Sequence, residues 1–304
     1  MTTHSVRRAL LLANAIWLVP AIAGAQPTRG GAAKPSMLVS TSWLADHARD
    51  ANLVILQVGP KAQFDSVHIP GARHVALADI TLSQSESKLS TELAPPERLK
   101  AWAEANGIGN NSRIVIVPFD STLPASTRVF ITLAYMGAME RTSLLNGGLA
   151  AWRAEARPIS ADAPTAPKPT TFDLKLRADL IAVMGDVETA IKDDKISVID
   201  ARLPRFYNGD GGGYPRAGHI PTAKNIPLTT VSANGFIKTE SDLRQLFSTA
   251  GIGAKQPVIT YCHVGQQASL LWFVATMLGY DARMYDGSFQ EWSGTERLPV
   301  VGKP

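Results

Sequence analysis

Cysteine is almost absent from this sequence: Cys262 is the only one in 304 residues. A single thiol cannot close an intramolecular disulfide, so no disulfide framework can hold the fold. A lone cysteine is more often an inert core residue than a reactive one, because a free thiol packs like a small apolar side chain. The residues around Cys262 therefore have to show whether its sulfur has a chemical role.

Charge is also scarce, and the charged patterns of several protein classes are missing. Charged residues make up 18% of the chain, the formal net charge is +4, and basic residues never occur in runs longer than two. This balance predicts no nucleic-acid partner. The His, Cys and acidic residues show no metal-ligand spacing, and the Gly-rich segment 209–213 lacks the Lys-Ser/Thr pair of a phosphate-binding loop. We therefore expect neither a metal nor another cofactor.

Long apolar runs are missing too, except at the N-terminus. An arginine pair at residues 7–8 precedes an apolar run over residues 9–23, and small residues end it. This order is typical of a secretory signal peptide, here residues 1–25. A membrane anchor is the alternative, but the run is shorter than the roughly 20 residues of a spanning helix and contains Pro20. We expect a periplasmic or secreted protein that is free of the membrane after signal removal, with twin-arginine export as an alternative route.

The remaining sequence contains two copies of one pattern. The segment HIPGA at 68–72 returns as HIPTA at 219–223, and the β-rich run at 113–117 returns at 257–261. A repeat of this length is a whole domain rather than one unit of a solenoid. A chain of 304 residues is long enough for two such domains.

Strand and helix signals alternate within each copy. The segments 96–106 and 241–250 have apolar residues at helical spacing, and a glycine follows each. Strands separated by helices predict an α/β fold, with a mostly parallel sheet flanked by helices on both faces. Ligands of such sheets bind beyond the carboxyl ends of the strands. We predict two tandem domains over 37–156 and 173–304, joined by a semi-rigid, Pro-rich linker over 157–172.

Cys262 follows a predicted strand that ends at Tyr261, and a predicted helix begins near Ala268. Backbone N–H groups of the short loop between them can point at the sulfur, and the helix N-terminus adds partial positive charge. Both effects favour a thiolate and predict a lowered pKa for Cys262. Gly265 allows the loop dihedral angles that other residues avoid. This arrangement predicts a reactive cysteine.

Three motifs resemble those of the rhodanese superfamily. They are YCHVGQQAS at 261–269, YDGSFQEW at 285–292 and GHIPTAKNIP at 218–227. The first is similar to the active-site loop of that family, and weaker copies extend the resemblance over nearly all of the chain after the signal. The tandem layout, with one active copy, is similar to thiosulfate and 3-mercaptopyruvate sulfurtransferases. The resemblance implies two rhodanese-like domains and a sulfurtransferase activity.

The resemblance also implies roles for individual residues. Cys262 would take the sulfane sulfur of an anionic donor, release sulfite or pyruvate, and become a persulfide that a thiophilic acceptor such as cyanide or a thiol discharges. Arg202 matches a donor-binding arginine, since a guanidinium holds a sulfonate or carboxylate at two points. Asp200 is expected to support the local structure. The loop residues expected to bind the donor are His263, Val264, Gly265, Gln266, Gln267 and Ala268.

The first copy departs from this pattern. Asp120 stands at the position equivalent to Cys262, and Gln57 and Gly59 replace the Asp and Arg of the matching stretch. A carboxylate cannot carry a persulfide. We therefore predict that the first domain is catalytically silent, packs against the second domain and borders its active site.

Some alternatives stay open at this level. His263 could raise the thiolate fraction or point to solvent. The loop carries no fixed cation, which weakens the attraction of dianionic thiosulfate, so thiosulfate is favoured only slightly over 3-mercaptopyruvate. A non-enzymatic sulfur carrier, or a binding module that kept the fold, is the second hypothesis. A cysteine-dependent phosphatase is disfavoured because Ala268 stands where its phosphate-binding arginine would be.

Other residues are interpreted as structural. His68 and His219 share a His-Ile-Pro context that recurs in the silent copy, so we predict that both support turns. Trp152 and Trp292 are expected to anchor the two cores. Arg216 is expected to be a solvated surface charge rather than a second anion contact.

Overall fold

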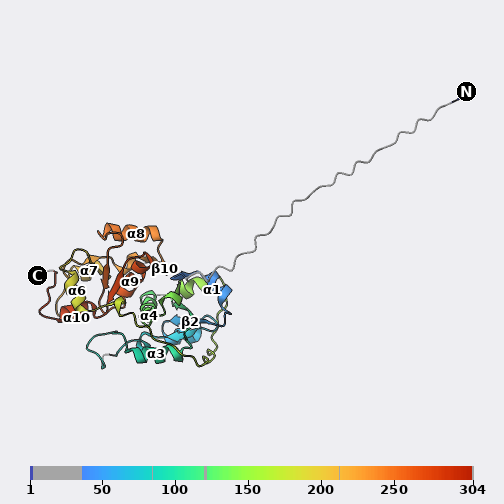
Figure 1. Cartoon of the computed structure of the whole chain (residues 1–304), viewed down its shortest axis with the longest axis horizontal. Helices are drawn as coiled ribbons and strands as arrows, with labels where there is room; N and C mark the ends of the chain where they lie inside the picture. The colour runs from blue at the N-terminus through green and yellow to red at the C-terminus, as the bar shows by residue number, and fades with distance from the viewer. Residues whose placement is uncertain (3–35, 84, 120–121, 212, 303–304) are drawn as a thin grey trace. The chain divides into compact units, whose positions relative to one another are not determined.

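The computed structural model describes residues 1–2 and 36–302, except positions 84, 120–121 and 212 (Figure 1). Residues 3–25 of the predicted signal peptide therefore lie outside the described residues, and so does Asp120. The described residues from 36 onward belong to one compact unit. No helix among the residues that the structure describes is long and apolar enough to cross a membrane.

The first half of this unit is built on a five-stranded parallel sheet with the order β1-β5-β4-β2-β3. Its strands are β1 (Leu38–Val39), β2 (Leu53–Val58), β3 (Arg73–Val75), β4 (Arg113–Pro118) and β5 (Thr142–Leu145). Its helices are α1 (Thr41–His47), α2 (Lys61–Ser66), α3 (Pro96–Ala105), α4 (Leu123–Tyr135) and α5 (Gly148–Ala154), with 3₁₀ turns η1 (Leu77–Asp79) and η2 (Met139–Arg141).

The second half repeats this sheet in the order β6-β12-β11-β7-β8, again with parallel neighbours. Its strands are β6 (Ile181–Ala182), β7 (Ser197–Asp200), β8 (Lys224–Asn225), β11 (Val258–Tyr261) and β12 (Ala282–Tyr285). Its helices are α6 (Met184–Ala190), α7 (Pro204–Tyr207), α8 (Glu240–Thr249), α9 (Ala268–Met277) and α10 (Ser288–Gly294), with 3₁₀ turns η3 (Ala178–Leu180) and η4 (Leu228–Thr230). A small antiparallel hairpin, β9 (Ser232–Ala233) with β10 (Phe236–Ile237), has no counterpart among the described strands of the first half.

The apolar pattern of the central strands explains why both sheet faces are covered. Along β2, Val54 and Leu56 face one cluster of buried side chains and Ile55 faces another. Side chains alternate between the two faces of a strand, so an unbroken apolar run is buried on both sides. Helices α1, α2 and α5 supply the second cluster, and α3 and α4 supply the first.

The two halves share one core. The first cluster continues from α4 into α8 and α9 of the second half, and α4 and α9 lie side by side (Figure 1). Phe130 of α4 packs against Trp272 and Phe273 of α9, with ring centroids 6.2 and 4.9 Å apart. The predicted α/β fold with two parallel, helix-flanked sheets is confirmed, and so is the packing of the first half against the second. The predicted domain boundaries at 37–156 and 173–304 stay a prediction.

Candidate active site

Cys262 lies at the carboxyl end of β11, immediately after Tyr261, and α9 begins six residues later at Ala268. The strand pairs with β7 and β12 on either side, so this end of the sheet is held by two neighbours. The Cys262 side chain is 0% exposed. The strand–loop–helix placement that the sequence predicted is therefore present.

Two opposing effects act on the Cys262 thiol. Burial raises its pKa above the ordinary value, while the backbone N–H groups of Ala268, Val264, Gln267 and Gly265 donate to the sulfur and lower its pKa. Burial is the larger effect, so the net pKa is raised. The sequence prediction of a lowered pKa is wrong in net direction, because loop amides can be inferred from a motif whereas the desolvation of the sulfur depends on the packing around it. The four donors themselves are present as predicted.

The loop carbonyls explain why these N–H groups face the sulfur. The His263 carbonyl accepts a hydrogen bond from the Gln290 N–H at 3.0 Å, and the Gln266 carbonyl accepts one from Ser269 Oγ at 2.7 Å. In a trans peptide the C=O and the following N–H point in opposite directions. Fixing a carbonyl outward therefore turns the next N–H, that of Val264 or Gln267, inward toward the sulfur.

Helix α10 supports the nucleophile from a second side. Ser288 Oγ accepts a hydrogen bond from the Cys262 N–H at 3.2 Å and donates to the Tyr285 carbonyl at 2.8 Å. The Phe289 N–H donates to the Cys262 carbonyl at 3.0 Å. Both backbone polar groups of Cys262 are thus bonded, and its position follows that of α10.

Gly265 occupies a position that a larger residue could not take without a shift. Its φ is +82°, and a Cβ built there would lie 2.9 Å from the Asp286 carbonyl oxygen and 3.1 Å from Arg128 Nη1. Positive φ values favour glycine. The loop therefore needs glycine both for its backbone and for the close approach of Asp286 and Arg128.

His263 lies in an aromatic environment beside the nucleophile. Its Nδ1 is 3.0 Å from Tyr214 Oη, and its ring contacts Phe206 edge-on at 4.7 Å. Burial, followed by the charge of Arg202, lowers the pKa of His263 to about 4. The imidazole is consequently neutral at pH 7, so of the two sequence alternatives it is not a cation that raises the thiolate fraction, and it is not a ring that simply points to solvent.

Tyr214 is a neighbour of the nucleophile that the sequence interpretation missed. Burial, followed by the charge of the Cys262 thiolate, raises the pKa of Tyr214 to about 12. Its ring stacks on His263 and contacts Phe289 edge-on at 5.6 Å. The phenol stays protonated at pH 7 and offers a neutral hydrogen-bond donor near the sulfur.

The remaining loop residues have distinct surroundings. The Val264 carbonyl accepts a hydrogen bond from Thr91 Oγ1 of the first half. The side-chain oxygen of Gln267 is buried and has no hydrogen-bond partner among the described residues. Ala268 is fully buried, and Gln266 is half-buried. Of the six predicted loop residues, four supply N–H groups to the sulfur, so their backbone is more informative than their side chains.

Arg202, the predicted donor-binding arginine, is buried beside Asp200. Its guanidinium is 1% exposed, bonds to Asp200 with Nη2 2.6 Å from Oδ2, and also donates to the Gly218 carbonyl at 2.7 Å. The group lies 4.0 Å from the centre of the Phe289 ring. Its hydrogen bonds use Nε and Nη2 of the guanidinium and hold it against Asp200 and Gly218, and its predicted contact with a donor stays a prediction. The structural role expected for Asp200 is confirmed.

A second arginine, Arg205 on α7, is exposed and lies close to the aromatic residues around His263. Arg205 is exposed and stacks on Phe206 at 4.5 Å, and Phe206 contacts the His263 ring. Arg205 comes three residues after Arg202, in the same segment after β7. Arg205 was not among the residues predicted from the sequence, and its exposure makes it a second candidate for an anion contact.

The structure confirms the turn role of the two histidines. His68 Nδ1 bonds the Phe64 carbonyl at 2.8 Å, and His219 Nδ1 bonds the Tyr207 carbonyl at 2.7 Å. Arg216 is wrong as a surface charge, because its guanidinium bonds backbone carbonyls at the end of α10, among them Trp292 at 3.0 Å. The carbonyls at the end of a helix carry partial negative charge, which attracts a cation.

Both core tryptophans are buried and bonded in the same way. Trp152 Nε1 donates to the Pro158 carbonyl at 2.7 Å, and Trp292 Nε1 donates to the Pro299 carbonyl at 2.8 Å. The predicted anchoring role of the pair is confirmed. The described residues contain no group of three or more His, Cys, Asp or Glu side chains that could hold a metal ion.

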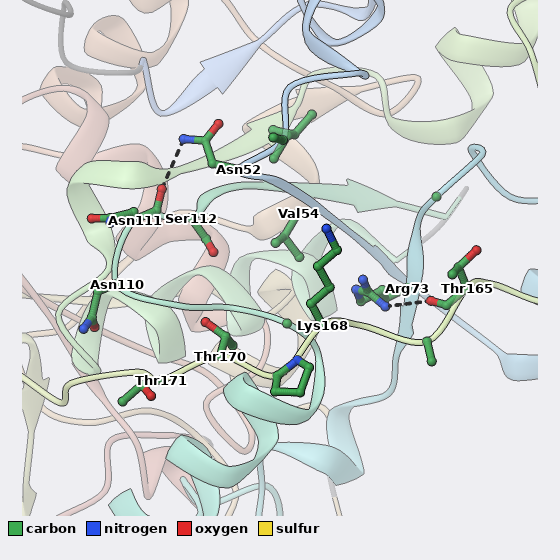
Figure 2. Close-up of a pocket in the computed structure, with 16 residues that line it drawn as sticks. Asn52, Val54, Arg73, Asn110, Asn111, Ser112, Thr165, Lys168, Thr170 and Thr171 are labelled. Carbon is green, nitrogen blue, oxygen red and sulfur yellow. Dashed lines mark hydrogen bonds between the residues drawn. The ribbon is translucent and has the colours of Figure 1, made fainter.

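A separate pocket of about 710 Å³ lies at the other end of the first sheet (Figure 2). It is lined by Asn52 before β2, Ser112 before β4, and linker residues that include Lys168 and Thr170. No residue of the loop 262–268 lines it. Parallel sheets bind ligands beyond the carboxyl ends of their strands, so this pocket at the amino ends is distinct from the candidate active site.

Comparison with known sequences matches the family model of the rhodanese-like domain twice, at residues 40–155 and 184–295. The sulfur carrier protein TtuD of Thermus thermophilus is 30% identical over 287 residues, which cover 89% of this chain and 98% of that protein. The 3-mercaptopyruvate sulfurtransferase of Escherichia coli is 30% identical over 277 residues, which cover 86% of this chain and 96% of that protein.

Comparison with solved structures gives the same architecture. The SseA structure from Escherichia coli aligns with a TM-score of 0.76 and 24% identity, covering 84% of this chain and 99% of that one. An anaerobic ergothioneine biosynthesis enzyme of Chlorobium limicola aligns with a TM-score of 0.77 and 19% identity, covering 88% and 71%. At these identities the likeness shows the fold alone.

Proposed function

We propose that this chain, which belongs to the rhodanese family and is a sulfurtransferase, carries a sulfane sulfur on Cys262 between an anionic donor and a thiophilic acceptor. The observation that supports this most directly is the convergence of four backbone N–H groups on the Cys262 sulfur. No other cysteine exists in the sequence that could carry the sulfur.

The first half-reaction loads the sulfur. The Cys262 thiolate attacks the outer sulfur of thiosulfate, an S–S bond forms to the enzyme, and the S–S bond of the donor breaks with its electron pair leaving on sulfite. With 3-mercaptopyruvate the C–S bond breaks instead, and pyruvate leaves as an enolate that takes up the thiol proton. In both cases the enzyme is left as a persulfide.

The second half-reaction unloads the sulfur. The acceptor, cyanide or a thiolate, attacks the outer persulfide sulfur, and the S–S bond breaks with its electron pair returning to Cys262. Thiocyanate or a new persulfide leaves, and the thiolate is regenerated without net oxidation or reduction of the enzyme. Small donors and acceptors of this kind are the partners that the proposal requires.

The loop amides have a specific part in this cycle. A thiolate and a persulfide anion carry negative charge in the same cradle, and preorganised N–H donors in a site shielded from water stabilise such charge without further reorganisation. Burial raises the pKa of the resting thiol, which the N–H groups only partly offset. The pKa of Cys262 therefore depends on the balance between burial and these N–H groups, and a donor anion that enters the site and displaces water changes that balance.

In this proposal Arg202 keeps its predicted role in binding the donor, and Arg205 is added as a cation that attracts it. Arg205 is exposed on α7, whereas the guanidinium of Arg202 is enclosed by Asp200 and Gly218. An exposed guanidinium over the ring of Phe206, which itself contacts His263, can meet a sulfonate or a carboxylate. Thiosulfate stays slightly favoured over 3-mercaptopyruvate as donor.

A carrier without small-molecule turnover is the second candidate, because one relative with 30% identity is named a sulfur carrier protein. Both candidates use a Cys262 persulfide. They differ in whether free cyanide or a thiol discharges it rapidly. A single sulfur per chain, released only slowly, would support the carrier.

The deciding experiment incubates the mature protein separately with thiosulfate and with 3-mercaptopyruvate, adds cyanide, and follows thiocyanate. Continuous release from one donor, abolished in Cys262→Ser, is the expected result. Mass analysis of the intact chain should show one added sulfur before cyanide is added. No turnover, combined with no sulfur on Cys262 after incubation with either donor, would overturn the proposal.

We also propose that residues 1–25 direct export and are then removed, and that the domain containing Asp120 is catalytically silent. The mass of the protein purified from the periplasm or medium tests the first point, since cleavage after residue 25 predicts a defined loss. Full retention of the N-terminus in a cytoplasmic fraction would contradict it. The second point predicts that Cys262→Ser leaves no sulfur bound anywhere on the chain.

A further inference from the structure

A short segment of the first domain, residues 90–93, lies directly against the loop that carries Cys262. We name it the strap. It belongs to the long connection between η1 and α3. Three hydrogen bonds join it to the second domain: Thr91 Oγ1 to the Val264 carbonyl, the Ser90 N–H to Gln290 Oε1 at 2.8 Å, and the Leu93 N–H to Asp286 Oδ2 at 3.0 Å.

Thr91 is held in an unfavourable backbone conformation at this contact. Its φ is +59°, which is an outlier for a β-branched residue. Such conformations persist only where the surroundings fix them, and they gather at functional sites. The surroundings here are the loop, through the Thr91 hydroxyl, and Arg128, whose Nη2 donates to the Thr91 carbonyl at 2.6 Å.

Arg128 connects the strap to the second domain, because it bonds both the Thr91 carbonyl and the Asp286 carboxylate. It lies on α4 of the first domain, is 0% exposed, and forms an ion pair with Asp286. Its Nη1 approaches Met284 Sδ at 3.5 Å. A buried guanidinium is costly unless it is paired and hydrogen-bonded, so the position of Arg128 fixes those of Thr91 and Asp286 together.

Asp286 stands next to the residues that hold the nucleophile. Ser288, two residues further, accepts the hydrogen bond from the Cys262 N–H. The Asp286 carbonyl oxygen also lies close to Gly265, 2.9 Å from where a Cβ on that residue would stand. The first domain therefore contacts both supports of Cys262, the loop and the start of α10.

The strap has a geometric effect on the sulfur. The Gly265 N–H is one of the donors to Cys262, and it belongs to the peptide whose carbonyl is that of Val264. Because C=O and N–H of a trans peptide point in opposite directions, the Thr91 hydroxyl that holds the Val264 carbonyl outward also directs the Gly265 N–H inward. Without that hydroxyl the Val264 carbonyl loses this hydrogen bond, and the orientation of the peptide plane is less restrained.

We infer that Thr91 and Arg128 of the silent domain are positioning residues for the Cys262 thiolate and persulfide. Neither residue reaches the sulfur in the contacts described above; both act through Val264 and Asp286. This inference rests on the proposed function, since it concerns the same nucleophile. It assigns to the domain that has Asp120 at the equivalent position a defined task in the reaction of the other.

The test compares Thr91→Ala and Thr91→Ser with Thr81→Val as the matched control. Thr81 lies in the same connection, but its Oγ1 donates to the Leu77 carbonyl at 2.9 Å within the first domain. We expect Thr91→Ala to lower kcat on the order of tenfold with KM nearly unchanged, which is less than the roughly 10²–10³-fold effect of losing such a donor, because the Gly265 N–H is misdirected and not removed. Thr91→Ser keeps the hydroxyl and should restore kcat, and Thr81→Val should match the wild type.

A second readout does not depend on sulfur transfer. The rate of Cys262 alkylation by iodoacetamide is followed against pH by intact mass, and the single thiol makes the signal unambiguous. Thr91→Ala should shift the midpoint of this profile to higher pH, because one N–H donor to the thiolate is misdirected. A wild-type profile and kcat in Thr91→Ala would overturn the inference. A wild type that transfers no sulfur would overturn the proposed function instead, while the alkylation profile still decides the role of Thr91.

Arg128 is tested in the same two assays. Arg128→Gln is compared with Arg141→Gln, since Arg141 is a half-buried arginine of the first domain that donates to the Gly109 and Ser112 carbonyls. Arg128→Gln should lower kcat by about 10²-fold, the typical effect of misplacing a reacting group by about 1 Å. Equal kcat values in the two variants would contradict the role of Arg128. If Arg128→Gln does not fold, the Thr91 variants decide.

Discussion

Thr127 Oγ1 and Ser269 Oγ lie 2.8 Å apart, and the two residues are 142 positions apart in the sequence. That spacing is the repeat distance between Asp120 and Cys262, so equivalent residues of the two halves meet each other. Thr127 lies in the first turns of α4 and Ser269 in the first turn of α9. Phe130 and Trp272, which pack together, have the same spacing. The two domains therefore contact one another through α4 and α9, the helices that follow positions 120 and 262 in the sequence.

This pair predicts a measurable coupling. Thr127→Val should lower the free energy of unfolding by about 1–2 kcal/mol, because it removes one hydrogen-bonding partner from a buried hydroxyl. The loss of unfolding free energy in the double variant Thr127→Val with Ser269→Ala should be smaller than the sum of the losses in the two single variants, as expected for residues in contact. Urea denaturation of the four proteins measures the coupling. Strictly additive effects would show that the Thr127–Ser269 contact contributes nothing.

Gly265 offers a prediction that separates backbone strain from contact. Gly265→Ala should lower kcat, since the added Cβ meets the Asp286 carbonyl. It should also lower the free energy of unfolding by about 1–3 kcal/mol, since the residue has a positive φ. Gly279→Ala is the matched control, because Gly279 has a φ of +86° but nothing within 4 Å of the added Cβ. Both variants carry the same kind of backbone strain. We expect only Gly265→Ala to impair thiocyanate formation, and equal activities would show that the close approach to Asp286 has no effect on the sulfur.

Arg202 can be tested as a structural residue against an exposed ion pair of the same spacing. Arg202→Gln should lower the free energy of unfolding by about 3–5 kcal/mol, because it leaves the buried carboxylate of Asp200 without its partner. Arg177→Gln breaks an exposed bidentate pair with Asp179, also two residues away, and should cost less than about 1 kcal/mol. The comparison uses thermal or urea denaturation. A stable Arg202→Gln protein whose only defect is a raised KM for the donor would instead support the predicted donor-binding role.

The fold could be predicted from the sequence because its signals are local and repeated. The segments 96–106 and 241–250 became α3 and α8 within one residue at each end. The run before Cys262 became β11. Alternating strand and helix patterns leave few arrangements other than two covered parallel sheets, so composition and periodicity were sufficient.

The site could be predicted only in part, because its remaining features depend on contacts between distant segments. Nothing in the local sequence of Thr91 or Arg128 indicates that they meet Val264 and Asp286 of the other domain. The burial of Arg202 and the net direction of the pKa of Cys262 also follow from tertiary packing. A motif identifies residue types in order, whereas desolvation and ion pairing are properties of the assembled neighbourhood.

His263 gives a pH dependence whose sign can be stated. Its pKa is lowered in the folded protein from the ordinary 6.5 to about 4, first by burial and then by the charge of Arg202. Between these two values the unfolded chain binds a proton at this site and the folded protein does not, so the free energy of unfolding falls as the pH is lowered through that window. The contribution is fully present above the unfolded pKa.

We therefore expect urea denaturation at a series of pH values from about 7 to about 4 to show a declining midpoint for the wild type and a shallower decline for His263→Asn. His47→Asn is the control, since the ring of His47 lies on α1 and bonds the Trp43 carbonyl of its own helix. A wild-type slope in His263→Asn would mean that the folded protein accommodates the charged imidazole after all. In that case His263 could act as a cation beside Cys262 at acidic pH, and the loading rate with thiosulfate should then rise, rather than fall, as the pH is lowered.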